Sequence, residues 1–169
     1  GIGAIIPFAS GPAVTITTIA GGLVGIPAFI GFGSSVNGAT ALGSTIDTTN
    51  ISNLAFSVPR DGTITSITAY FSVTAALTLT GSSVTIVAQL YQSTTPNNTF
   101  SPIAGTLVTL SPSLSGVVSM GTNCSGTTSG LLIPVTTKTR LMLVISATAS
   151  GISLINNIIG YVSAGVAIS

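Results

Sequence analysis

Hydrophobic and polar side chains alternate along residues 63–91, and this stretch organises the prediction for the whole chain. Between positions 67 and 79 the odd positions are apolar, and most even positions carry Thr, Ser or Tyr. Successive side chains of a β-strand point to opposite faces, so the alternation is typical of a strand with one buried face. Gly-Ser-Ser at 81–83 interrupts the pattern, and apolar residues then return at the even positions from 84 to 90. The stretch therefore predicts a β-hairpin that turns at 81–83.

Short strands of the same kind are predicted on both sides of this hairpin. Upstream they are 4–8, 14–17, 28–32 and 51–58, with a polar loop at 36–50 that holds Asp47. Downstream they are 106–110, 131–135, 141–147 and 158–168, with loops at 111–116 and 119–130. The segments 59–62 and 94–98 have residues typical of tight turns, and no stretch has the capping pattern of an α-helix. About ten short strands separated by turns predict an all-β antiparallel sandwich or jelly roll.

Two features of these strands predict how they are arranged. The first and last strands both have apolar faces, so we expect them to pair in one sheet. The strand at 141–147 is apolar on both faces, because Met142 and Val144 lie opposite Leu141, Leu143 and Ile145. Both faces should therefore be covered, and we expect one of them to face another subunit.

The composition makes the surface of the molecule unusual. The chain has 169 residues, suited to a single domain over 1–169, of which only 3% are charged. An average soluble protein has roughly 25% charged residues. A compact chain of 16.6 kDa with a mean hydropathy of +0.83 would expose on the order of 7,600 Å² of surface. Three basic and two acidic side chains cannot cover that area. Hydroxyl and amide side chains must therefore cover the rest of this surface, or other copies of the chain must bury it, or both.

Charge and hydropathy also exclude several partners. The net charge of +1 provides no electrostatic footprint for nucleic acid or anionic lipid. The purest apolar run, 141–145, is far shorter than the 18 or so residues of a spanning helix. A membrane β-barrel is an alternative, but the chain has no tryptophan and no tyrosine pairs at strand ends. No signal peptide is visible, and Gly1 suggests a trimmed or mature piece. We therefore expect no nucleic acid partner and no membrane insertion.

The residues needed for catalysis are nearly absent. Without histidine, a Ser–His or Cys–His pair and an imidazole metal site are excluded. Asp47 and Asp61 are the only carboxylates, and although such a pair could in principle serve glycoside hydrolysis, the turn sequence explains Asp61. Calcium bound by either one would need several more oxygen ligands from the backbone or from Asn. A Ser–Lys dyad with Lys138 is formally available, whereas a lysine beside Arg140 fits a strand edge kept soluble. We predict that the protein is not an enzyme, with no catalytic, cofactor-binding or metal residues and no cofactor.

The few charges could pair with one another. Arg60 and Asp61 are neighbours in the turn at 59–62. Asp47 could form an ion pair with Lys138 or Arg140, within one subunit or between two. A double-mutant cycle on these residues would measure such a coupling.

Cys124 is the sole cysteine, so a disulfide framework within the chain is excluded. Two alternatives remain for it, an unpaired thiol without a role and a disulfide between subunits. Three matches to the N-glycosylation pattern, at 50–52, 97–99 and 123–125, are expected by chance in so Asn- and Thr-rich a chain.

Six stretches are distinctive in their exact amino-acid sequence rather than in their hydrophobic periodicity. They are AIIPFASG at 4–11, IGFGSS at 30–35, VPRDGTITSI at 58–67, QLYQS at 89–93, PIAGT at 102–106 and LINNIIGYVSAG at 154–165. Together they resemble the C-terminal domain of BclB-type collagen-like glycoproteins on the surface (exosporium) of Bacillus and Clostridium spores. The resemblance covers essentially the whole chain, and PRDGTI is its most specific part.

The resemblance implies a fold, an assembly and a location. Proteins of this type carry a long Gly-X-Y stalk ahead of such a domain, and related spore-surface domains are trimeric jelly rolls similar to C1q and tumour necrosis factor. It thus implies a homotrimer that caps a collagen-like stalk on the spore surface, outside the cell, and mediates adhesion to host or abiotic surfaces. The stalk itself is not in this sequence, and the family offers no catalytic motif. The alternative is a lectin-like or receptor-binding module that recognises a ligand through its Ser/Thr/Gly-rich loops.

Overall fold

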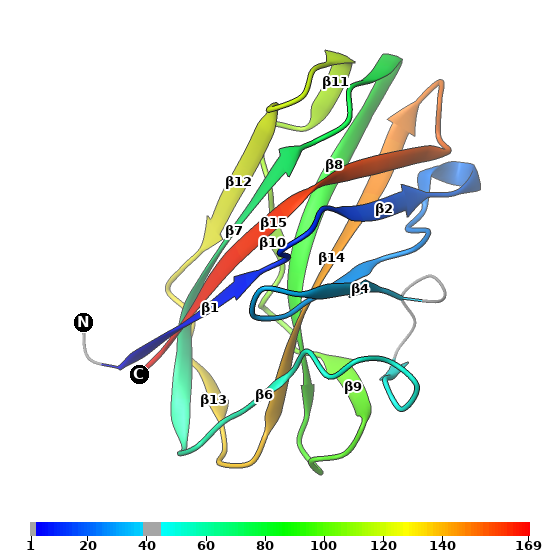
Figure 1. Cartoon of the computed structure of the whole chain (residues 1–169). Helices are drawn as coiled ribbons and strands as arrows, with labels where there is room; N and C mark the ends of the chain where they lie inside the picture. The colour runs from blue at the N-terminus through cyan, green and yellow to red at the C-terminus, as the bar shows by residue number, and fades with distance from the viewer. Residues whose placement is uncertain (1–2, 39–44) are drawn as a thin grey trace.

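The computed structural model describes residues 3–38 and 45–169 as two antiparallel β-sheets packed face to face (Figure 1). One sheet, here called the terminal sheet, has β7 (Gly62–Val73) and β15 (Asn156–Ile168) at its centre. β1 (Ala4–Ala9) and β2 (Val14–Thr18) follow one another along β15. β12 (Asn123–Thr128) and β13 (Ile133–Val135) follow one another along the free side of β7.

The second sheet has β8 (Leu77–Ser93) and β14 (Arg140–Gly151) at its centre. β3 (Ala28–Ile30) and β6 (Phe56–Ser57) pair with β14, and β4 (Ser35–Asn37) pairs with β3. β9 (Thr99–Pro102), β10 (Val108–Thr109) and β11 (Leu114–Val118) pair with β8, and β5 (Ile46–Asp47) pairs with β9. The described residues contain one helical element, the three-residue 3-10 turn η1 (Ala20–Gly22).

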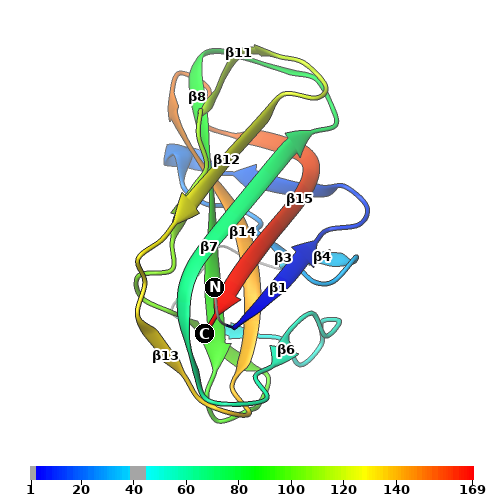
Figure 2. The same ribbon diagram turned by 90° about the vertical axis from the view of Figure 1, so that its left-hand side faces the viewer.

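The strands pair in a nested order along the chain. β1 and β2 pair with β15, β3 pairs with β14, β7 pairs with β12, and β8 pairs with β11. Nested antiparallel pairing of this kind is the topology of a jelly roll. Figure 2 shows β12, β7, β15 and β1 as one layer in front of β8 and β14. The predicted all-β antiparallel jelly roll is therefore confirmed, and so is the pairing of the first and last strands, with Ala4 opposite Ile168.

The hairpin predicted over 63–91 is wrong in two respects. β7 and β8 lie in different sheets and do not pair, and the chain reverses at 74–76 rather than at 81–83. Gly81 lies inside β8 with a φ of 70°, at a bulge opposite Ser115 and Gly116 that moves the buried side chains from odd to even positions. Alternation showed which side of each strand is buried. It could not show that the two buried sides face each other from opposite sheets.

The core lies between the two sheets. From β7 the buried side chains are Ile64, Ile67, Ala69, Phe71 and Val73, and from β8 they are Leu79, Val84, Ile86, Ala88 and Leu90. Apart from Ile64, these are apolar positions that the alternation identified, whereas Ala75 and Leu77, which it also placed on the buried side, are only half-buried. Among the described residues, no buried side-chain nitrogen or oxygen atom lacks a hydrogen-bond partner. The interior therefore needs no ligand or ion to satisfy its polar atoms.

A second, smaller apolar cluster lies on the outer face of the second sheet. Met142 and Val144 of β14 are only 2% exposed there, and they pack with Phe29, Leu54, Tyr91 and Phe100. Leu54 comes from the segment before β6, where a strand was predicted over 51–58 but only Phe56–Ser57 are in a strand. The prediction that the strand at 141–147 faces another subunit is therefore wrong, because the chain covers this face itself. Residues 39–44 of the predicted polar loop lie outside the described residues.

Two predicted loops contain strands. β12 lies within 119–130, and β11 begins within 111–116. The sequence of β12, Asn-Cys-Ser-Gly-Thr-Thr, has no apolar alternation and several residues that are unfavourable in strands. Its hydrogen bonds with β7 hold it in the sheet. The strands predicted at 28–32, 106–110 and 131–135 are present but shorter.

Candidate functional site

The charged side chains of the chain lie at one end of the sandwich, where β7 and β14 begin and β8 ends. Arg140 lies over the ring of Phe100, 5.0 Å from its centroid, and donates hydrogen bonds to Asn53 (2.7 Å) and Asn98 (2.9 Å). The Asp61 carboxylate accepts a hydrogen bond from the Thr137 amide (2.8 Å). We call this region the charged end; it is the lower end in Figure 1.

Neither predicted ion pair is seen among the described residues. Arg60 donates to the backbone carbonyl of Asp61 and not to its carboxylate. The Asp47 carboxylate accepts hydrogen bonds from the Thr49 hydroxyl (2.6 Å) and the Thr49 amide (2.9 Å), and these bonds lower its pKa. Asp47, Asp61, Arg60 and Arg140 thus form hydrogen bonds to backbone groups or uncharged side chains.

The residues considered for catalysis show no arrangement for it. Asp47 lies in β5 and Asp61 lies in the turn before β7. Lys138 lies in the turn between β13 and β14, with a φ of 73°. In residues 3–38 and 45–169, no three His, Cys, Asp or Glu residues are grouped as a metal site would require. No helix in this part of the chain could span a bilayer.

Cys124 lies on β12 and is buried in the core, 2% exposed, rather than in a loop as predicted. A side chain in this position is incompatible with a disulfide between subunits, so that alternative is wrong. Burial raises the pKa of the Cys124 thiol to about 11 from its ordinary value of 9.0, because the apolar surroundings disfavour the thiolate.

This burial predicts how the protein responds to alkali. Above pH 9 the thiol of the unfolded chain ionises while the folded chain keeps its proton up to about pH 11. The folded state therefore binds more protons than the unfolded state in this window. The contribution of the thiol to the free energy of unfolding should be fully present below pH 9 and should be lost as the pH rises toward 11. Urea unfolding of the wild type and of Cys124→Ala, measured from pH 7 to 11, checks this. An equal decline in both proteins would contradict it.

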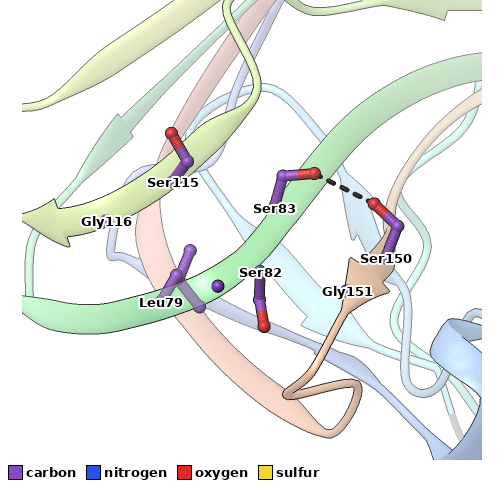
Figure 3. Close-up of a pocket in the computed structure, with 8 residues that line it drawn as sticks. Leu79, Ser82, Ser83, Ser115, Gly116, Ser150 and Gly151 are labelled. Carbon is purple, nitrogen blue, oxygen red and sulfur yellow. Dashed lines mark hydrogen bonds between the residues drawn. The ribbon is translucent and has the colours of Figure 1, made fainter.

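An open hollow of about 390 Å³ lies over the bulge of β8 (Figure 3). Its lining residues come from β8, β11 and β14: Leu79, Gly81, Ser82, Ser83, Ser115, Gly116, Ser150 and Gly151. The hydroxyls of Ser83 and Ser150 are hydrogen-bonded to each other at 3.0 Å. The hollow thus offers neutral hydroxyl groups and no charged or titratable one.

The outer face of the terminal sheet is a regular surface without a charged side chain among the described residues. Tyr161 of β15 is 51% exposed and lies opposite Ser72 of β7, while Tyr70 of β7 is 38% exposed and lies opposite Ser163. The two rings are therefore diagonal neighbours at the centre of the sheet. The positions around them carry small, hydroxyl, amide or aliphatic side chains: Ile5, Pro7 and Ala9 on β1, Ser66 and Thr68 on β7, Asn123, Ser125 and Thr127 on β12, and Gly165 and Ala167 on β15.

A face of this kind is suited to protein contact. It places two amphipathic aromatic rings amid small, aliphatic and hydroxyl side chains, and it holds no charge that would be left unpaired on burial. Sequence reasoning missed it, because Tyr70 and Tyr161 are far apart in the chain. The missing signal was the pairing of β7 with β15.

No family model matches the chain. Over its whole length the chain is 31% identical to Collagen-like protein 1 of Acanthamoeba polyphaga mimivirus, and it spans 19% of that protein. Two solved structures are similar to 98% of the chain, both with a TM-score of 0.41. One is the Eiger TNF of S. frugiperda (10% identity, 93% of that chain), and the other is infectious bursal disease virus strain Gx (12% identity, 31% of that chain). Similarity to a collagen-like protein is thus confirmed, while the spore-surface type remains a prediction.

Proposed function

We propose that this chain is a non-enzymatic domain that associates into a homotrimer and caps a collagen-like stalk. The observation that carries the proposal is the uncharged outer face of the terminal sheet, with Tyr70 and Tyr161 at its centre. A single copy exposes 7737 Å² of surface to solvent, and very few charged side chains are available to cover it. Contact between copies through this face removes apolar surface and both rings from water.

Three copies fit the collagen-like partner. A collagen triple helix has three chains, so a domain that holds three copies together also sets three stalk strands in register. The relative that is 31% identical over the whole chain carries the name collagen-like protein. Gly3 lies against Ile168, and the Ser169 carbonyl accepts a hydrogen bond from Thr63 (2.9 Å) at the start of β7. A stalk joined ahead of β1 would therefore leave near the charged end.

The location and the adhesive role rest on the sequence resemblance. The stretches at 4–11, 58–67 and 154–165 resemble domains of spore-surface glycoproteins, so we place this domain on the spore surface, where it contacts host or abiotic surfaces. Antibody labelling of intact spores of the source organism, before and after removal of the outermost layer, tests the location.

The second candidate is a ligand-binding module of the lectin-like kind. The hydroxyl-lined hollow over β8 is the observation that favours it, because neutral hydroxyls suit a neutral polar ligand such as a saccharide. A screen of soluble saccharides by calorimetry tests it. Saturable binding that is lost in Ser83→Ala/Ser150→Ala would favour this candidate over a purely structural role.

The proposed trimer predicts a definite mass and a particular melting behaviour. In dilute, detergent-free buffer, light scattering should give three times 16.6 kDa. An interface of at least about 1,600 Å² per pair would couple folding to assembly, so the melting temperature should rise with protein concentration and be high. A single chain of 16.6 kDa that melts at one temperature at all concentrations would contradict the proposal.

A further inference from the structure

The end of the sandwich opposite the charged end exposes large aliphatic side chains to solvent. It is the end where β7, β11 and β14 finish and β8, β12 and β15 begin, at the top of Figure 1. Its most exposed apolar residues are Val117 (83%), Met120 (73%), Ile152 (83%) and Ile155 (71%). Neither segment that carries them, 117–122 or 151–156, contains a charged residue. We call this region the apolar end.

The four side chains stand on two separate projections. Val117 lies near the end of β11 and Met120 in the β11–β12 connection, while Ile152 and Ile155 belong to the β14–β15 connection. Val117 is paired with Thr78 of β8, whereas the Ile152 side chain lies over Gly81, three residues further along the same strand. The two projections are therefore about 10 Å apart along β8. The lining of the hydroxyl-lined hollow includes Gly116 and Gly151, which directly precede Val117 and Ile152 in the chain.

Several backbone groups of both projections are hydrogen-bonded within the chain. In the first, the Gly121 amide donates to Val73 O (2.8 Å) and the Thr122 amide to Ser119 O (3.1 Å). In the second, the Ile152 amide donates to Gly81 O (3.1 Å), the Ser153 amide donates to Ser82 Oγ (2.6 Å), and Leu154 O accepts from Thr18 Oγ1 (2.7 Å). These bonds fix the backbone of both loops, while the amides of Met120, Leu154 and Ile155 have no partner among the described residues and need water or a polar headgroup.

We propose that the apolar end docks on a lipid surface with electrically neutral headgroups. Two aliphatic projections on a convex end suit a deformable lipid layer, into whose headgroup–acyl boundary single side chains can sink. The hollow would lie at headgroup depth, where serine hydroxyls can donate hydrogen bonds to a phosphate oxygen. The absence of charge at this end matches a zwitterionic surface and provides no attraction to an anionic one.

This inference names a partner for the adhesive role proposed above and rests on that role. It does not depend on the trimer, since the apolar end and the outer face of the terminal sheet are different surfaces. If three copies do assemble with their charged ends toward a stalk, three apolar ends would engage one membrane, and the combined binding would be stronger than that of one copy.

Flotation with phosphatidylcholine vesicles tests the inference. The wild-type protein should float with these vesicles, and the variant Val117→Ser/Ile152→Ser should lose at least about tenfold in apparent affinity. The matched control is Leu132→Ser, which removes an equally exposed (83%) aliphatic side chain from the β12–β13 connection. It should bind as the wild type does. Adding phosphatidylserine or raising the salt concentration should change binding little.

Three results would overturn the inference. They are no flotation of the wild type, equal binding by the double variant, or a fall in solution mass of the double variant without vesicles. The last would show that the apolar end joins copies of the chain instead. Failure of the trimer is seen separately, as a wild-type mass of one chain in the light-scattering experiment.

Discussion

Tyr161→Lys combined with Tyr70→Lys should convert the proposed homotrimer to single folded chains. Both side chains are at least one-third exposed in a single copy, so the substitutions leave the core of that copy intact. In the assembly they would place two ammonium groups on a face that offers no carboxylate. Burying an unpaired charge costs several kcal/mol, far more than one tyrosine contact contributes, so association should weaken more than a hundredfold.

The measurement is light scattering over a range of concentrations, with far-ultraviolet circular dichroism to verify folding. Thr148→Lys is the control, because it adds the same charge at an exposed strand position on the outer face of the second sheet. It should keep the wild-type mass. A trimeric double variant would show that the copies meet through another surface and would refute the assignment of this face.

Gly160→Ala should destabilise the fold by about 3 kcal/mol, a large share of the stability of a domain this size. Gly160 faces the core from β15, and a Cβ atom there would lie 2.4 Å from Ser72 O and 2.6 Å from the Phe71 ring. Neither neighbour can yield easily, since Ser72 O belongs to the central strand β7 and Phe71 is completely buried. The strands β7 and β15 would have to separate, or the ring would have to leave its position.

Gly165→Ala is the matched control on the same strand. Gly165 lies on the outer face, and a Cβ atom there would meet only the Ile5 side chain at 3.9 Å. This substitution should leave stability unchanged or raise it slightly, because alanine loses less backbone entropy on folding. Urea unfolding of the two variants gives the comparison. Equal stabilities would show that the close packing of Phe71 on Gly160 is not needed for the fold.

The candidate surfaces could be predicted from the sequence only in part. The scarcity of charge indicated that apolar or hydroxyl surface must be covered by something, and the outer face of the terminal sheet is a surface of this kind. The strand that faces another subunit was predicted wrongly to be 141–147, because the apolar residues Met142 and Val144 are conspicuous in the sequence. Phe100 and Leu54 cover them, and both come from segments distant in the chain.

Cys124 and β12 show the same limit. A run of Asn, Ser, Gly and Thr has no alternation to indicate a strand, so the sequence predicted a loop and left the thiol accessible. The hydrogen bonds that make this segment a strand are donated and accepted by β7, more than fifty residues away. Only that pairing buries the thiol and raises its pKa.

The sequence by itself determined which side of each regular strand is buried, that the protein is all-β, and that few charges are available to its surface. These properties follow from side chains and from the two-residue period of an extended chain, which are local. The tertiary structure alone decided which strands pair, that β7 and β8 belong to opposite sheets, and which apolar face remains uncovered. Strand pairing uses backbone groups that are the same at nearly every residue, so the choice of partner is made by the packing of the whole domain.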